Sequence, residues 1–186
     1  VGLYIVVLVA MFGMYLYTYR RKLLYNLRHM LFFTILVALL VATAFIVLRH
    51  VAAGYIYLIP FAWVPIIARV FYDSRTAIFI HLITILIVSI AAPAPYVFVL
   101  LQVITGIVAV ISLRDMTQRA QLAQTALFVF LAYSVVYTAM AMLVTGDMSS
   151  LEYNHYIYFA INAVLVICAY GLIFLFERTF GLVSNI

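Results

Sequence analysis

The stretch LAQTALFVFLAYSVVYTAMAMLV, residues 122–144, runs for 23 residues without a charged side chain. An α-helix needs about 20 apolar residues to cross the hydrocarbon core of a bilayer, so this stretch can span a membrane. Six further apolar runs are 17 to 21 residues long and continuous, whereas a transmembrane β-barrel shows segments of about 10 residues with alternating polarity. The seven runs are residues 1–19, 30–48, 55–72, 76–92, 95–113, 122–144 and 156–176. The sequence therefore predicts an all-α integral membrane protein, a bundle of seven transmembrane helices.

Composition indicates the same class. Apolar residues make up 70% of the chain and charged residues only 8%, with a mean hydropathy of +1.28. A soluble chain of 186 residues needs a larger polar fraction to cover its surface. The loops and tails are too short for a second domain, so residues 1–186 are predicted to form a single transmembrane domain. The chain starts inside an apolar run and without a methionine, so we expect it to be a piece of a longer protein.

Basic residues are distributed unevenly between the predicted loops. Nine of the ten Lys and Arg residues fall on one side of the membrane, and only Arg49 falls on the other. Cytoplasmic loops carry the excess of Lys and Arg. With seven helices, this places the N-terminus outside and the C-terminus in the cytoplasm. The net charge of +5 is then explained by topology and by attraction to anionic lipid. No nucleic-acid partner is expected, because no nucleic-acid-binding module accompanies the charge.

The sequence contains no motif typical of an active site, and the acidic residues do not form a cluster. Asp147, Glu152 and His155 share the longest outer loop. We interpret them as a solvated surface, with a weak cation site as the alternative. No catalytic residue, metal site or cofactor is therefore predicted for this chain. The single cysteine, Cys168, excludes an internal disulfide and is expected to be a small buried residue.

Three polar residues within the apolar runs are the best candidates for a binding site. His81, Gln102 and Asn162 lie where hydrocarbon penalises polar groups. Gln102 and Asn162 are expected to form hydrogen bonds between helices, worth about 0.6–2 kcal/mol each. His81 is interpreted as a neutral imidazole bonded to a neighbouring helix, with a ligand-binding or proton-sensing role as the alternative. If a small ligand binds inside the bundle, these three side chains are its expected polar contacts.

The run 55–72 contains two prolines, Pro60 and Pro65. Proline removes a backbone donor and clashes with the preceding turn, so this helix is predicted to kink or loosen between Ile59 and Ile66. A switch needs an element with two arrangements, and this helix is our candidate for it. The alternative is that the prolines simply shape a rigid bundle.

The last run, 156–176, is expected to be the rod that carries a signal out of the membrane. It leads directly into the C-terminal exit, and Gly171 is its only expected interior break. Glu177 and Arg178 mark the point where this helix enters the cytoplasmic interface, and we assign signal output to them.

Three segments resemble the transmembrane region of bacterial seven-transmembrane receptors that carry an intracellular HD hydrolase domain. They are the basic first loop with its run into the second helix (RRKLLYNLRHMLFF, 20–33), the proline-bearing third helix with its short loop (IPFAWVPIIARVFYDSRTA, 59–77) and the C-terminal exit (FERTFGLVSNI, 176–186). The resemblance covers essentially the whole chain. The C-terminal segment is its most specific part.

The resemblance implies an extracytoplasmic sensory domain before the first helix and a cytoplasmic HD phosphohydrolase after the last. Members with the HD domain are associated with hydrolysis of cyclic di-AMP, and their metal-binding histidines and aspartates belong to that domain. This chain would then be a catalytically inert sensor and anchor in the bacterial inner membrane. Its expected partners are the lipid bilayer, the two covalently linked domains and, as an open alternative, further copies of the same chain.

Two other classes compete with this interpretation. A small membrane transporter or substrate-capture subunit would explain the proline-bearing helix and the buried polar residues. An intramembrane enzyme ranks last, because the sequence offers no nucleophile or metal cluster. The codons after Ile186 separate the first two: an HD motif there favours the receptor, and a stop codon favours the transporter.

The predicted topology can be tested by accessibility labelling. Cysteines introduced near Arg21 and Arg119 should be shielded from a membrane-impermeant reagent added outside, whereas one near Ser150 should react. Labelling of the Arg119 site from the outer face would contradict the topology.

Overall fold

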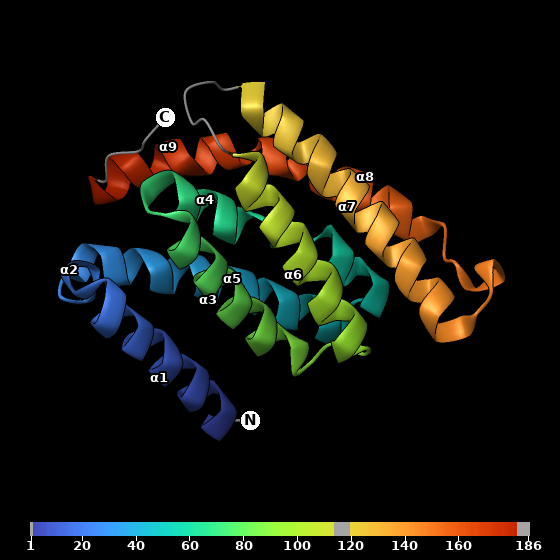
Figure 1. Cartoon of the computed structure of the whole chain (residues 1–186), viewed down its shortest axis with the longest axis horizontal. Helices are drawn as coiled ribbons and strands as arrows, with labels where there is room; N and C mark the ends of the chain where they lie inside the picture. Colours follow the sequence, from blue (N-terminus) through green and yellow to red (C-terminus); the bar gives the residue numbers. More distant parts are fainter. Residues whose placement is uncertain (1, 114–119, 182–186) are drawn as a thin grey trace.

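The computed structural model describes residues 2–113 and 120–181, and every regular element in these ranges is helical (Figure 1). The elements in chain order are α1 (Gly2–Tyr19), α2 (Arg21–Leu24), α3 (Leu27–His50), the 3-10 helix η1 (Ala53–Leu58), α4 (Trp63–Phe71), α5 (Ser74–Ser89), α6 (Pro95–Ser112), α7 (Ala120–Thr145), the 3-10 helix η2 (Met148–Ser150), α8 (Asn154–Ile167) and α9 (Ala169–Phe180). The predicted all-α class is confirmed.

Six stretches of the described chain are long and apolar enough to cross a membrane. They are Gly2–Tyr19, Leu27–His50, Ala53–Phe71, Pro95–Ser112, Gln121–Thr145 and Asn154–Phe180. The predicted run 76–92 corresponds to α5, which has only 16 residues. Its length of about 24 Å is less than the hydrocarbon thickness of about 30 Å. The protein is thus a multi-pass membrane bundle, and a seventh crossing by α5 stays a prediction.

The third span consists of two helical pieces instead of one kinked helix. η1 ends at Leu58 and α4 begins at Trp63, so the interruption covers residues 59–62 and includes Pro60. Pro65 lies in the first turn of α4, where a helix makes no use of the backbone N–H that proline lacks. Only one of the two prolines therefore lies where the helix is interrupted.

The expectation of a continuous last helix with a break at Gly171 is wrong. The helix is interrupted at Cys168, between α8 and α9. The N–H of Cys168 donates to the carbonyl of Leu165 and that of Gly171 donates to Cys168, both at 3.0 Å, which is the tighter i to i+3 spacing. The expectation of a buried Cys168 is also wrong, because the residue is exposed on the bundle surface.

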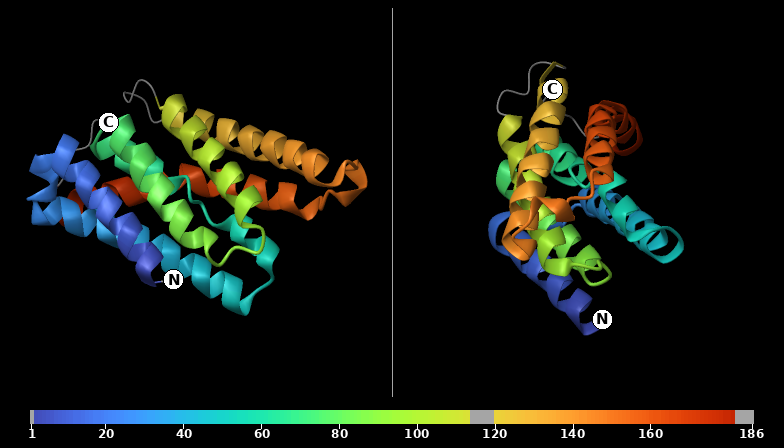
Figure 2. Two further views of the ribbon diagram at one scale, coloured as in Figure 1. Left: turned by 60° about the horizontal axis from the view of Figure 1, so that its bottom comes forward. Right: turned by 90° about the vertical axis from the view of Figure 1, so that its right-hand side faces the viewer.

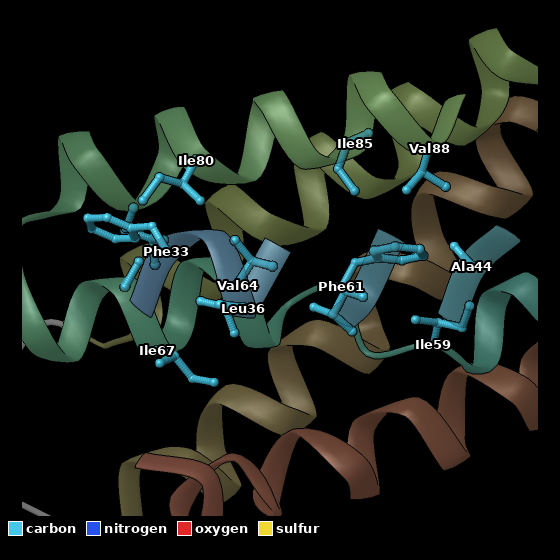
Figure 3. Close-up of a cluster of buried hydrophobic side chains, with 14 of the residues drawn as sticks. Phe33, Leu36, Ala44, Ile59, Phe61, Val64, Ile67, Ile80, Ile85 and Val88 are labelled. Atoms are coloured by element: carbon cyan, nitrogen blue, oxygen red, sulfur yellow. The ribbon is translucent and has the colours of Figure 1, made fainter. Parts of the chain in front are cut away.

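The bundle is packed around α4 and α5, which are covered by their neighbours. Figure 3 shows side chains from α3, the segment around α4 and α5 pointing toward one another in one apolar cluster. On one side, α7 and α8 run alongside each other, and α1 lies on the opposite flank (Figures 1 and 2). Because lipid tails are as apolar as this core, close packing and hydrogen bonds hold the helices together rather than exclusion of water.

Basic side chains collect at one end of the bundle, which we call the basic end. Arg20 in the turn after α1 forms an ion pair with Asp73 before α5, with 3.0 Å between Nη2 and Oδ1. The rings of Phe176 and Phe180 in α9 contact Phe32 in α3 at this end. Among the described Lys and Arg residues, those at the basic end are Arg20, Arg21, Lys22, Arg28, Arg69, Arg75 and Arg178, and Arg49 lies at the opposite end. Arg114 and Arg119 of the predicted basic loop lie outside the described residues.

Candidate functional site

The interruption of the third span leaves backbone carbonyl groups that need partners. Pro60 follows η1 and has no N–H, so it cannot donate to the Tyr57 carbonyl as the i to i+3 pattern requires. The buried side chain of Asn162 in α8 takes over this role. Its Nδ2 donates to the carbonyl oxygens of Tyr57 and Ile59, both at 2.9 Å. Hydrocarbon offers no other donor to the Tyr57 carbonyl, so Asn162 makes this break tolerable inside a membrane. The Ile59 carbonyl also accepts the N–H of Phe61 at 2.8 Å.

A second hydrogen bond crosses the same interface in the opposite direction. Trp63, the first residue of α4, donates from its indole Nε1 to the carbonyl oxygen of Leu165 at 2.8 Å. Leu165 belongs to the tight turn at Cys168 that separates α8 from α9. Each interrupted span thus supplies a side chain to the backbone of the other. We call the contacts made by Asn162 and Trp63 the reciprocal junction.

Gln102 in α6 connects the helices beside the junction. Tyr133 in α7 donates its hydroxyl to Gln102 Oε1 at 2.6 Å, and Nε2 of His81 in α5 lies 2.9 Å from the Gln102 carbonyl oxygen. A carbonyl oxygen only accepts, so the proton of this contact lies on Nε2 of His81. The ring of Tyr133 stacks on Phe159, which precedes Asn162 by one turn of α8, at 5.0 Å. We call His81, Gln102, Tyr133 and Asn162 the polar cluster.

The polar cluster has hydrogen-bonding capacity that the described chain does not use. His81 Nδ1, Gln102 Nε2 and Asn162 Oδ1 are buried and have no hydrogen-bond partner among the described residues. They amount to one donor and two acceptors, given the proton on Nε2 of His81. Buried polar groups of this kind are usually satisfied by water or by a ligand.

A pocket of about 270 Å³ opens at the end of the bundle opposite the basic end. η1, the turn before α6 and the start of α8 form its walls. His155 is only 8% exposed; its Nδ1 lies 2.7 Å from the Tyr137 hydroxyl, and its Nε2 lies 3.5 Å from a carboxylate oxygen of Glu152. The lining residues are Ala53, Gly54, Ile56, Tyr57, Ala92, Pro93, Ala94, Phe98, Glu152 and His155. Tyr57 belongs both to this pocket and, through its carbonyl, to the reciprocal junction.

Comparison with known families gives one match. The family model described as "7TM receptor with intracellular HD hydrolase" matches residues 1–184. The chain belongs to this family. No curated protein and no solved structure matches it. The chain is therefore a membrane receptor domain and not the HD catalytic domain, and a role as a membrane sensor is supported.

The receptor domain brings the three predicted ligand-contact residues together. His81, Gln102 and Asn162 are each at most 1% exposed and belong to the polar cluster. Their predicted hydrogen bonds to neighbouring helices are present, since His81 bonds α6 and Asn162 bonds the segment around Pro60. Contact with a ligand stays a prediction.

Sequence reasoning missed Trp63 and Tyr133. Trp63 is the single tryptophan and lies away from the ends of its span, and Tyr133 lies in the middle of the run 122–144. Aromatic residues with a polar tip usually mark the membrane interface. Their place deep within a span was a signal that the N–H and O–H groups need partners inside the bundle.

The acidic outer loop differs from the predicted solvated surface at one residue. His155 is buried against Tyr137, whereas Glu152 is exposed. Asp147 accepts hydrogen bonds from the backbone N–H and the hydroxyl of Ser149, which hold the pKa of its carboxyl below the ordinary value. Within the described ranges, no three His, Cys, Asp or Glu side chains are placed to share a metal ion.

The predicted output residues lie in the last turn of α9 at the basic end. The carbonyl of Glu177 accepts the N–H of Gly181, which adopts a left-handed conformation (φ 62°) and ends the helix. Arg178 is exposed on the same turn. Their role in signal output stays a prediction.

Replacement of Gly106 by alanine should disturb the polar cluster. A Cβ at this position would lie 2.2 Å from Nε2 of the buried His81 ring, so the ring would have to leave the Gln102 carbonyl. Overpacking of this kind costs about 1–3 kcal/mol. We expect Gly106→Ala to lower the midpoint of thermal unfolding in detergent micelles.

Gly13→Ala is the matched control, because nothing lies within 4 Å of its added Cβ in α1. It should leave stability unchanged or raise it by about 0.5–1 kcal/mol. In a His81→Ala background the cost of Gly106→Ala should largely disappear. An equal cost with and without the imidazole would contradict the proposed contact.

Proposed function

We propose that this receptor domain is a membrane-embedded sensor that transmits a signal to a C-terminal cytoplasmic HD phosphodiesterase acting on cyclic di-AMP, in a bacterial inner membrane. Family membership supports the sensor role and the linked HD hydrolase. The reciprocal junction is the observation that carries the mechanism. It connects a pocket at one end of the bundle with α9, the helix that leaves the bundle at the other.

The path of the signal begins in the pocket of about 270 Å³ at the end of the bundle opposite the basic end. Gly54, Ile56 and Tyr57 of η1 line this pocket, so a molecule bound there contacts the first half of the interrupted third span. The carbonyls of Tyr57 and Ile59 are held by Asn162. A shift of η1 therefore changes the hydrogen bonds on α8 directly.

The junction passes this shift to the output helix. Trp63 holds Leu165 in the turn at Cys168, so movement of α4 changes the angle between α8 and α9. The far end of α9 packs Phe176 and Phe180 on Phe32 in α3. In place of a straight rod, the output element is a hinged helix with its hinge at the junction.

Such a switch works only if the signal favours one arrangement over the other. A ligand shifts the equilibrium by the difference between its affinities for the two states. A coupling of about 1–3 kcal/mol changes affinity about 5- to 150-fold. The interrupted span suits this role, because the backbone hydrogen bonds through residues 59–62, such as that from the Phe61 N–H to the Ile59 carbonyl at 2.8 Å, do not form a continuous i to i+4 ladder.

The catalytic step belongs to the linked domain. Among the described residues, no three His, Cys, Asp or Glu side chains are placed to hold a metal ion, as metal-dependent hydrolysis requires. The association with cyclic di-AMP follows from the resemblance of the chain to its family and concerns the HD domain alone. A transporter or substrate-capture subunit is the alternative function, and the family match does not favour it.

The two prolines offer a direct test of the switch. Pro60→Ala restores an N–H that can bond the Tyr57 carbonyl and so competes with Asn162. Pro65→Ala adds an N–H in the first turn of α4, where none is needed, and serves as the control. In the full-length receptor in bilayers, Pro60→Ala should change basal or stimulated hydrolysis of cyclic di-AMP several-fold, and Pro65→Ala should not.

The isolated HD domain lacks the membrane helices and so both prolines, and its activity is the reference for hydrolysis without input from the membrane domain. If folded Pro60→Ala and wild-type receptors have equal activity and equal signal response, the interruption at residues 59–62 does not act as a switch.

The membrane domain alone should have no hydrolytic activity. Purified residues 1–186 are expected to leave cyclic di-AMP intact in the presence of Mn²⁺ or Mg²⁺, while the full-length receptor cleaves it. Metal-dependent turnover by the membrane domain, retained after a further purification step, would refute this assignment.

A further inference from the structure

We propose that the groove between α1, α3 and α5 and the basic pocket next to it bind one anionic phospholipid, with the phosphate on Arg21 and Lys22 and an acyl chain in the groove. This inference does not depend on the proposed function.

The groove has a volume of about 390 Å³ and is lined almost entirely by apolar side chains. α1 and α3 form its walls and α5 its floor. Thr34 is the single polar residue in the lining, and its hydroxyl already donates to the Met30 carbonyl of its own helix at 2.8 Å. The groove therefore offers no hydrogen-bond donor to an occupant, as suits a hydrocarbon chain.

The groove faces lipid because α1 packs on the bundle along one side only. The rings of Phe12 and Tyr15 stack on Phe79 of α5, and the Tyr15 hydroxyl lies 3.2 Å from the Thr76 hydroxyl. Away from this contact the apolar side chains of α1 are exposed, and Val6 is 62% exposed. Figure 2 shows α1 at the edge of the bundle, with its N-terminal end directed away from the core.

At the basic end a larger pocket of about 720 Å³ lies beside α2. Its lining residues are Thr18, Tyr19, Arg20, Arg21, Lys22, Leu23, Phe71, Tyr72 and Asp73. Three cationic side chains thus share the pocket with one carboxylate, Asp73. Partial burial would raise the pKa of Asp73, but hydrogen bonds from Thr76 and Arg20 outweigh it and hold the pKa below the ordinary value. Asp73 is therefore ionised at neutral pH.

Asp73 neutralises Arg20 through their 3.0 Å ion pair, which leaves Arg21 and Lys22 as the excess positive charge. Arg21 uses its Nε to donate to the Tyr17 carbonyl at 2.9 Å, and its guanidinium lies over the Tyr17 ring at 4.4 Å. The side chain is thereby held in place while its terminal N–H groups stay free for an anion. Basic pockets between membrane helices are typical sites for phospholipid phosphates.

The two cavities adjoin each other. Tyr72 lines the basic pocket, Phe33 lines the groove, and their rings are in contact with centroids 4.7 Å apart. An occupant of both cavities would bridge this pair of rings, with its anion in the pocket and its chain in the groove. A phospholipid combines these two parts, whereas free phosphate has only the first.

A second copy of the chain is a weaker candidate for the same face. A symmetric dimer brings identical patches together, so the clusters at Arg21 and Lys22 would approach each other without a compensating anion. Like charges at an interface oppose association.

The test uses the full-length protein in detergent, with bound lipid counted by native mass spectrometry. Phosphatidylglycerol should bind more tightly than zwitterionic phosphatidylcholine of the same chain length. Each cation near the surface contributes about fivefold, so Arg21→Ala/Lys22→Ala should weaken phosphatidylglycerol binding about 30-fold. Arg49→Ala at the opposite end should have no effect, and Arg21→Lys should retain most of the affinity.

The groove is tested separately with two exposed alanines of α3. Ala38 lines the groove and Ala42, one turn away, does not. Ala38→Trp should fill the groove and abolish retention of the lipid, while Ala42→Trp should not. All variants must keep the wild-type unfolding midpoint in lipid-free detergent, which separates lost binding from lost folding.

Three results would overturn the proposal. They are equal binding of both phospholipids, unchanged binding by the Arg21→Ala/Lys22→Ala variant, and displacement of phosphatidylglycerol by millimolar inorganic phosphate, which would indicate a phosphate site without a chain. A dimer that Ala38→Trp dissociates would assign the groove to a second copy instead.

Discussion

The fold depends on the requirement that every backbone polar group inside hydrocarbon finds a partner within the protein. Pro60 breaks this rule locally, because it removes the donor that the Tyr57 carbonyl needs. Asn162, 105 residues away in sequence, meets the requirement. Trp63 adds a second donor to the Leu165 carbonyl, which already accepts the N–H of Cys168 in the turn between α8 and α9. The two interrupted spans are thus joined by side-chain-to-backbone hydrogen bonds in both directions, and the remaining helices pack around them.

In the polar cluster, too, buried polar groups find partners on neighbouring helices. Tyr133 and His81 both use Gln102, one through its side chain and the other through its carbonyl. Gly106 leaves room for the imidazole, so the approach of α5 to α6 depends on a missing side chain. A receptor needs interior contacts that are specific yet few, and hydrogen bonds between membrane helices of about 0.6 kcal/mol on average meet that need.

The spans and the polar candidates could be predicted from sequence, and their partners could not. Hydropathy marks a span because about 20 apolar residues are needed to cross the bilayer. The helix α5 is shorter than its predicted run, because the chain turns ahead of Pro93 and Pro95. A proline breaks a helix only at a position whose backbone N–H would otherwise bond within the helix. Pro65 leaves α4 intact because it lies in the first turn, where that N–H has no partner in the helix. The turn at Cys168 has no local signature. Its Leu165 carbonyl also accepts the indole N–H of Trp63, which only the folded chain brings there.

The position of Trp63 has an optical consequence. It is the only tryptophan in the receptor domain, and its indole N–H is bonded at the contact between the two interrupted spans. The energy of indole emission responds to hydrogen bonding and to the polarity around the ring. The domain therefore carries a built-in fluorophore at the reciprocal junction, and any rearrangement of that junction can be followed by light without attaching a label.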